Sequence, residues 1–284
     1  MKRNSGACVC RQLRYHPRPS TNKGQGAFTF VELLVVIALM MILCSLLVPA
    51  IQKAFAIAQE KSCAANMRSW GLAFLLYAGD HEGHLPHPDG RERNATPGVS
   101  DPAHPEHEKG YMDVLPPYLG KRPWRDYPTG EKPTRGIWQC PRARPLPDSA
   151  YSYRPSVDGY FSYAMNSYLA HDFLFGLPWN VKLQPRFLSL SKCVSPAQTI
   201  LLFEQTLDPG QGYGQAGSLK TAGYFGAEDA RALTERHGHT QGGLGSNVLY
   251  LDGHVGWRND LWDKALKNPR IPTRGDLTWF PYAY

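Results

Sequence analysis

Three histidines lie close together in the segment that runs from Asp80 to Asp89, DHEGHLPHPD. Imidazole and carboxylate groups together suit zinc and similar metals. However, the prolines here exclude a regular helix with two ligands on one face, and the pattern H-E-x-x-H is missing from the sequence. We keep His81, His84 and His87 as metal candidates beside a simpler interpretation, a solvated polar loop.

No stretch of the sequence has the spacing of a catalytic nucleophile or of a nucleotide-binding loop. The patterns G-x-S-x-G and G-x-x-x-x-G-K-[ST] and the dinucleotide fingerprint all lack a match. Cys140 precedes Pro141, which predicts a turn or one half of a disulfide. We therefore expect neither catalysis nor a bound cofactor.

The six cysteines are scattered along the chain. Three of them, Cys63, Cys140 and Cys193, follow the apolar segment described below. In an oxidising compartment they allow one disulfide and one free thiol. The sequence does not choose the pair, and three unpaired buried thiols remain an alternative.

A segment of 19 residues without a charge runs from Leu33 to Ile51. Together with the four residues 28–31 it is long enough to cross a bilayer as a helix. Glu32 interrupts the apolar stretch near its start, and an ionisable group inside a membrane segment costs on the order of a few kcal/mol unless it has a partner.

The positive charge of the chain is concentrated ahead of this segment. Residues 1–27 contain six basic residues and no acid, which leaves 25 basic against 24 acidic residues in the remainder (31 − 6 = 25). Positive charge beside a span marks its cytoplasmic side. The net charge of +7 therefore does not indicate nucleic-acid binding.

Two other kinds of N-terminal signal fit less well. An ordinary secretory signal could end at Ala54-Phe55-Ala56, but the apolar run is too long and Gln52 and Lys53 interrupt it. A lipidation site at Cys44 lacks the small residue expected in front of the cysteine.

The stretch from Gly26 to Ala38, GAFTFVELLVVIA, resembles the type IV prepilin (class III) signal. In that family a prepilin peptidase cuts before an aromatic residue and N-methylates the new terminus. The resemblance implies a cut between Ala27 and Phe28, although glycine is the usual residue before the cut. Glu32 is then the fifth mature residue, and Pro49 falls where such pilins commonly carry a proline.

The resemblance also implies a role for Glu32. In pilin-like filaments this glutamate is thought to meet the terminal amine of a neighbouring subunit. Such pairing offsets the cost of burying both charges. Glu32 would then act in assembly and Phe28 would supply the amine.

Beyond Pro49 the chain predicts a continuing amphipathic helix that ends near Gly79. The proline should kink or locally melt the helix. The apolar residues at roughly helical spacing, which predict its packing on a domain, are Ala54, Ile57, Ala58, Ala65, Leu72, Leu76 and Tyr77.

The remainder predicts an α+β domain, with an antiparallel sheet packed on the long helix. A short helix is expected near Met112–Leu119, a buried strand at 198–203, and a hairpin with a two-residue type I′ turn at Asp252-Gly253. We expect a leader at 1–27, a transmembrane helix at 28–51, its amphipathic continuation at 52–79, a Pro/Gly-rich loop region at 80–136 and the globular domain at 137–284.

Several patches resemble one group of pilin-like proteins, which carry a C-terminal histidine, nine residues and then Asp-Gly. The patches include 63–66, 138–141, 162–168, 195–201 and 248–255. Here fourteen residues separate His237 from Asp252, and twelve separate His239 from it. We expect Asp252-Gly253 to be a structural turn first.

These features predict a pilin-like or pseudopilin-like structural protein of a type II secretion or type IV pilus-like assembly. It would lie in the bacterial inner membrane, with its N-terminus in the cytoplasm and its domain outside. The expected partners are the prepilin peptidase, the membrane, and other pilin-like subunits or further copies of the chain, and no nucleic acid.

Two alternatives stay open. One is a metal-binding envelope protein. The other is a monomeric anchored binding domain, with an aromatic surface formed by Tyr151, Tyr153, Tyr160, Phe161 and Trp179.

Overall fold

A computed structural model describes eight parts of the chain. They are residues 28–86, 110–151, 153–166, 169, 189–208, 226–227, 232–238 and 244–259. The leader with Ala27 lies outside them, as do His87, Trp179 and His239.

The helix α1 (Phe30–Asp80) has 51 residues and dominates the N-terminal part of the chain. A kink or local melting is expected at Pro49; α1 is helical throughout with this proline inside it, so the melting does not occur. The chain divides into two compact units, Met1–Ala50 and Ile51–Tyr284, and each contains one part of α1.

The end of α1 differs from the expected cap at Gly79, which lies inside the helix. Glu82 and Gly83 instead adopt positive φ angles of 54° and 81°. The Gly83 N–H donates to the carbonyl of Ala78 at 2.7 Å, which is the six-to-one bond of a Schellman motif. The helix therefore ends one residue later than predicted.

The buried face of α1 is not the apolar face predicted from the sequence. Of the predicted residues Tyr77 is buried, whereas Leu72 and Leu76 are 54% and 44% exposed. The face that packs contains Glu60, Cys63, Ala64, Met67, Trp70, Gly71, Ala73, Phe74, Tyr77 and Ala78. The prediction failed because this face includes the charged residue Glu60 and also Cys63, whose disulfide partner Cys140 lies 77 residues away in the sequence.

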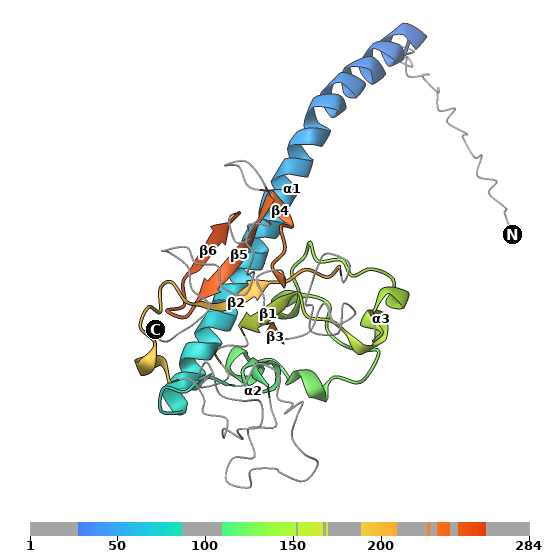
Figure 1. Cartoon of the computed structure of the whole chain (residues 1–284). Coiled ribbons are helices and arrows are strands. Elements are labelled where there is room, and N and C mark those ends of the chain that lie inside the picture. Colours follow the sequence, from blue (N-terminus) through green and yellow to red (C-terminus); the bar gives the residue numbers. More distant parts are fainter. Residues whose placement is uncertain are drawn as a thin grey trace, which may run out of the picture. The chain divides into compact units, whose positions relative to one another are not determined.

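A sheet of six short strands packs against this face (Figure 1). The strands are β1 (Tyr163–Asn166), β2 (Ile200–Glu204), β3 (Gly226–Ala227), β4 (His237–Gly238), β5 (Leu244–Tyr250) and β6 (Val255–Arg258). The order is β3-β1-β2-β5-β4, and β6 also pairs with β5. All pairs are antiparallel except β1 with β3. The α+β class with a long helix on an antiparallel sheet is confirmed.

Close packing of helix and sheet depends on Gly71. A Cβ atom at this position would lie 2.8 Å from Leu249 Cδ1 and 3.5 Å from the carbonyl oxygen of Gly253. Nearby, the Trp70 indole N–H donates to the carbonyl of Ile137 at 2.7 Å, and its ring meets Tyr111 edge-on. These contacts tie α1 to the core of the domain.

The hairpin of β5 and β6 forms as predicted, but its turn is of another type. A type I′ turn needs positive φ at both central residues, and of Asp252 and Gly253 only Gly253 has it, at 91°. The Gly253 N–H donates to Tyr250, and the Tyr250 N–H donates to His254. The loop thus has three residues, with Gly253 at the left-handed position.

The segment between helix and sheet is built from short turns of helix. They are α2 (Tyr111–Val114), α3 (Pro155–Asp158), and 3₁₀ turns at Pro116–Leu119, Trp124–Asp126, Gly136–Trp138 and Asp148–Ala150. A further 3₁₀ turn, Leu190–Lys192, lies between β1 and β2. The short helix expected near Met112–Leu119 appears as α2 and the 3₁₀ turn that follows it. Tyr111, Met112 and Leu115 are buried, so part of the predicted loop region belongs to the core.

Candidate functional site

The N-terminus of α1 is closed by its own side chains. The Thr29 N–H and hydroxyl both donate to Glu32 Oε2 at 2.8 Å, and the Glu32 N–H donates to the Thr29 hydroxyl oxygen at 3.2 Å. This reciprocal pattern is a capping box, with Thr29 as the N-cap. Sequence analysis missed it, although the spacing Thr-x-x-Glu was its signal.

The first part of α1 presents apolar side chains outward on all sides. Examples are Phe30 at 75%, Leu43 at 66% and Leu46 at 71% exposure. Among the described residues α1 is the one helix long and apolar enough to cross a membrane, with a mean hydropathy of 2.9 in its best window. This fits a single-pass anchor.

The histidines first considered as metal ligands have other partners. His81 Nδ1 lies 2.8 Å from the carbonyl oxygen of Tyr77, and the two rings stack. His84 Nδ1 lies 3.0 Å from the carbonyl oxygen of His81. His87 lies outside the described residues.

The aromatic residues considered as a binding surface are mostly internal. Tyr151, Tyr160 and Phe161 are all at most 9% exposed, and Tyr153 is partly buried. Trp179 lies outside the described residues. The described members of this set therefore do not form an exposed patch.

Two of the cysteines form a disulfide, Cys63–Cys140, with the Cα atoms 5.0 Å apart. Cys63 lies on α1 and Cys140 follows the 3₁₀ turn Gly136–Trp138, so the bond joins the helix to the domain across 77 residues. Cys193 is free, with its Sγ 3.5 Å from Thr199 Oγ1. Cys44, on the apolar part of α1, is also free.

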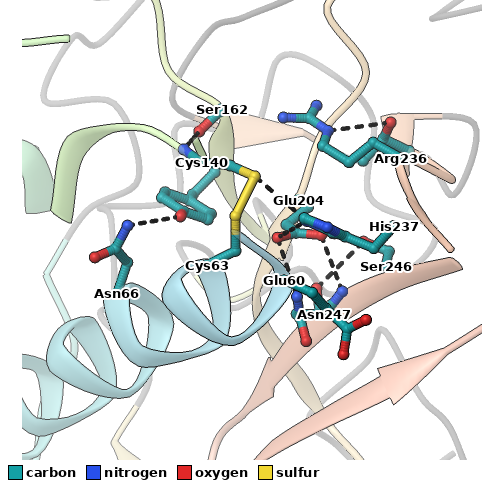
Figure 2. A network of polar contacts seen from close by, with 12 residues as sticks. Glu60, Cys63, Asn66, Cys140, Ser162, Glu204, Arg236, His237, Ser246 and Asn247 are labelled. Atoms are coloured by element: carbon teal, nitrogen blue, oxygen red, sulfur yellow. Dashed lines mark hydrogen bonds and ion pairs between the residues drawn. A yellow bond between two sulfur atoms is a disulfide. The ribbon is translucent and has the colours of Figure 1, made fainter. Parts of the chain in front are cut away.

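Next to the disulfide lies the buried carboxylate of Glu204, at the end of β2 (Figure 2). Its Oε2 accepts from the Asn247 N–H at 3.0 Å and from the Ser246 hydroxyl at 3.3 Å. Its Oε1 accepts from Asn247 Nδ2 at 3.2 Å and lies 3.0 Å from His237 Nε2. Two adjacent residues of β5 and one of β4 therefore hold both oxygens.

The ionised form of this carboxylate is favoured despite its burial. Burial alone would raise the pKa of Glu204, but the hydrogen bond from His237 and the charge of Arg236 outweigh it and bring the pKa below its ordinary value. In turn, burial lowers the pKa of Arg236, while the charge of Glu204 acts in the opposite direction. Glu204 thus keeps its charge in the interior, and the half-buried Arg236 supplies an opposite charge near it.

The imidazole of His237 connects the carboxylate to the disulfide. Its Nε2 lies 3.0 Å from Glu204 Oε1 and 3.3 Å from Cys140 Sγ, and the side chain is fully buried. Its Nδ1 has no hydrogen-bond partner among the residues that the structure describes. A single Nε2–H cannot point straight at both neighbours.

One group of potential metal ligands appears in the described part of the chain, and it is this cluster. The ligand atoms of Cys63, Cys140, Glu204 and His237 all lie within 4.8 Å of one another, and all four residues are buried. We call these four residues the buried quartet. Sequence analysis had singled out His237 and both cysteines separately, whereas Glu204 sits inside an apolar strand and gave no signal.

The structure does not join His237 to Asp252-Gly253. His237 pairs with Gly245 at the start of β5, whereas Asp252 follows the end of that strand. The Asp252 carboxylate instead accepts from the His254 N–H at 3.0 Å and lies 2.6 Å from His254 Nδ1. The two parts of the expected motif thus lie at opposite ends of β5.

Comparisons with known proteins bear on the N-terminus alone. Neither the curated proteins nor the solved structures gave a match. Residues 22–48 match the family described as prokaryotic N-terminal methylation motif, which supports a pilin-like protein that is processed by a prepilin peptidase and anchored in the inner membrane by one apolar helix.

Proposed function

We propose that this chain is a pseudopilin-type subunit of a type II secretion or type IV pilus-like assembly. Prepilin peptidase would cut between Ala27 and Phe28, leaving α1 as the anchor and the domain on the extracytoplasmic side. The match of residues 22–48 to the methylation motif carries this proposal. The role is structural and interactive rather than enzymatic.

The outer face of α1 supports a role in assembly. Beyond the apolar anchor, Ile57, Leu72, Leu75 and Leu76 are between 39% and 54% exposed although they belong to the domain part of the helix. Large apolar side chains that stay exposed on a folded domain are available to an interacting partner. Neighbouring subunits that pack α1 against α1 would cover it.

The N-terminal peptide from native membranes tests the processing step. We expect mass spectrometry to find a chain that begins with N-methyl Phe28. A chain that begins at Ala27 would move the cut by one residue. A chain that retains residues 1–27, or one that begins near Ile57, would contradict the proposal.

Substitutions at Glu32 test the assembly step, because two roles of this side chain can be separated. Glutamine also serves at the third position of a capping box, so Glu32→Gln keeps the bond to Thr29 and removes the charge. Glu32→Ala removes both. If the charge pairs with the Phe28 amine of a neighbour, both variants insert into the membrane and both lose crosslinked oligomers.

A difference between the two variants would contradict the charge pairing. Oligomers that persist in Glu32→Gln but disappear in Glu32→Ala would show that the helix cap matters and the charge pairing does not. Exposed Glu131→Gln is the matched control and should crosslink as the unmodified chain does.

A further inference from the structure

The buried quartet combines two sulfurs, one imidazole nitrogen and one carboxylate in the interior of the domain. Cys63 comes from α1, Cys140 from the segment after it, Glu204 from β2 and His237 from β4. Figure 2 shows the two sulfurs beside the side chains of Glu204 and His237. We propose that, with Cys63 and Cys140 reduced, the quartet binds one zinc ion.

The donor types are those that zinc prefers. Thiolate, imidazole and carboxylate groups are its usual ligands, and closed structural sites have four of them in tetrahedral arrangement. With metal–ligand distances of about 2.0–2.3 Å, ligand atoms on one zinc lie about 3.3–3.8 Å apart. The observed separation is 3.3 Å from Cys140 Sγ to His237 Nε2, at the short end of this range. The separation from His237 Nε2 to Glu204 Oε1 is 3.0 Å, slightly below it.

The two sulfurs must separate, and His237 Nε2 and Glu204 Oε1 must move apart by a few tenths of an ångström, for all four groups to reach this arrangement. Once the S–S bond is broken, Cys63 and Cys140 can separate by rotation of their side chains, while the backbone of α1 stays in place. One ion among the four atoms would also satisfy His237 Nε2, which in the oxidised form faces Glu204 and Cys140 with a single N–H.

Hydrogen bonds from neighbouring residues fix the orientation of the Glu204 carboxylate. Asn247 and Ser246 donate to Glu204 from β5, which fixes the orientation of its oxygens. Partners of this kind in the shell around a metal orient its ligands and increase affinity. Because Glu204 and His237 are held by strands and Cys63 by a helix, the site would be rigid.

The charges around the buried quartet also favour a bound zinc ion. Reduction without metal would place two ionisable thiols beside the Glu204 carboxylate in a site closed to water. Zinc with two thiolates and one carboxylate carries a net charge of −1, and the nearby Arg236 guanidinium, whose charge already acts on Glu204, offsets it. Full burial leaves no position for water, so the site would be structural rather than catalytic.

Zinc binding and the Cys63–Cys140 disulfide exclude each other, because two sulfurs that are bonded to each other cannot act as thiolate ligands. A dithiol or phosphine reductant supplies the two electrons that convert the S–S bond into two thiols. Zinc binding then displaces one proton from each thiol.

Zinc content of the reduced and oxidised chain tests the proposal. The full-length, tag-free protein in detergent would carry serine in place of Cys8, Cys10, Cys44 and Cys193, so that only the pair under test remains. After equilibration with zinc and removal of free ions, we expect one zinc per reduced chain and none per oxidised chain. Cobalt in place of zinc should give the absorption of a tetrahedral thiolate complex.

Variants then assign the ligands. His237→Ala and Glu204→Gln should each weaken zinc binding by more than about tenfold, whereas His84→Ala, outside the quartet, should leave it unchanged. Equal zinc in reduced and oxidised chains, or full binding after both Cys63→Ser and Cys140→Ser, would overturn the proposal. The comparison of redox states needs no substitution in the quartet, so it decides even if a variant fails to fold.

Discussion

At the scale of single residues, Glu204 is the least expected feature of the molecule. A carboxylate in the interior is costly unless donors surround it, and here hydrogen bonds from His237, Ser246 and Asn247 reach both of its oxygens. The helix, the hairpin and the disulfide all meet around this one group. Its loss should therefore affect the whole domain.

We expect Glu204→Gln to lower the free energy of unfolding by about 1–3 kcal/mol, because an amide places a donor where the carboxylate accepts bonds. Urea denaturation of the disulfide-bonded chain, followed by tryptophan fluorescence, measures the change. The exposed Glu131→Gln is the control and should shift stability by less than about 0.5 kcal/mol. An equal effect of the two substitutions would mean that the network around Glu204 contributes nothing.

At the scale of elements, two glycines have opposite surroundings: Gly245 lies against a neighbouring strand, whereas Gly79 faces open space. A Cβ atom at Gly245 would run into the backbone oxygen of Arg258 and the ring of Trp257 on the neighbouring strand. A Cβ atom at Gly79, inside α1, would meet no other atom within 4 Å. The same substitution should therefore have opposite effects at the two positions.

Gly245→Ala is expected to destabilise the domain by about 1–3 kcal/mol, since the strand β6 must move to make room. Gly79→Ala is expected to stabilise it by about 0.5–1 kcal/mol, because alanine favours the helix and nothing obstructs it. Thermal unfolding followed by circular dichroism gives both values. If Gly245→Ala were neutral, the pairing of β5 with β6 would be looser than the structure shows.

The elements were more predictable from the sequence than their packing. An uncharged run of 19 residues and the Asp-Gly pair are local signals, and both α1 and the hairpin follow from them. The side of α1 that packs was not predictable. Leu72 is apolar but exposed, whereas Glu60 is charged but buried. The buried quartet joins residues up to 174 positions apart (237 − 63 = 174), a relation that no local pattern contains.

At the scale of the whole molecule, α1 is divided between two compact units, with the boundary along the chain after Ala50. The part before this boundary exposes apolar side chains, whereas the part after it contributes Cys63, Met67, Trp70 and Phe74 to the core of the domain. The helix is thus an anchor at one end and a structural member of the domain at the other. Removing these two parts should have very different consequences.

A chain that begins at Ile51 should be soluble, form the Cys63–Cys140 disulfide and unfold cooperatively, because it keeps every core contact of its unit. A chain that begins at Gly79 loses Met67, Trp70 and Phe74 from the core. Burial of each such side chain contributes about 1.5–3 kcal/mol to the free energy of unfolding. These losses and the lost disulfide together amount to a large part of the roughly 5–15 kcal/mol that stabilises a typical domain. Near-ultraviolet circular dichroism during heating distinguishes the two: we expect a sharp transition for the longer chain and none for the shorter. A longer chain without a sharp transition would mean that the domain depends on the membrane-anchoring part of α1, and the boundary after Ala50 would then have no thermodynamic meaning.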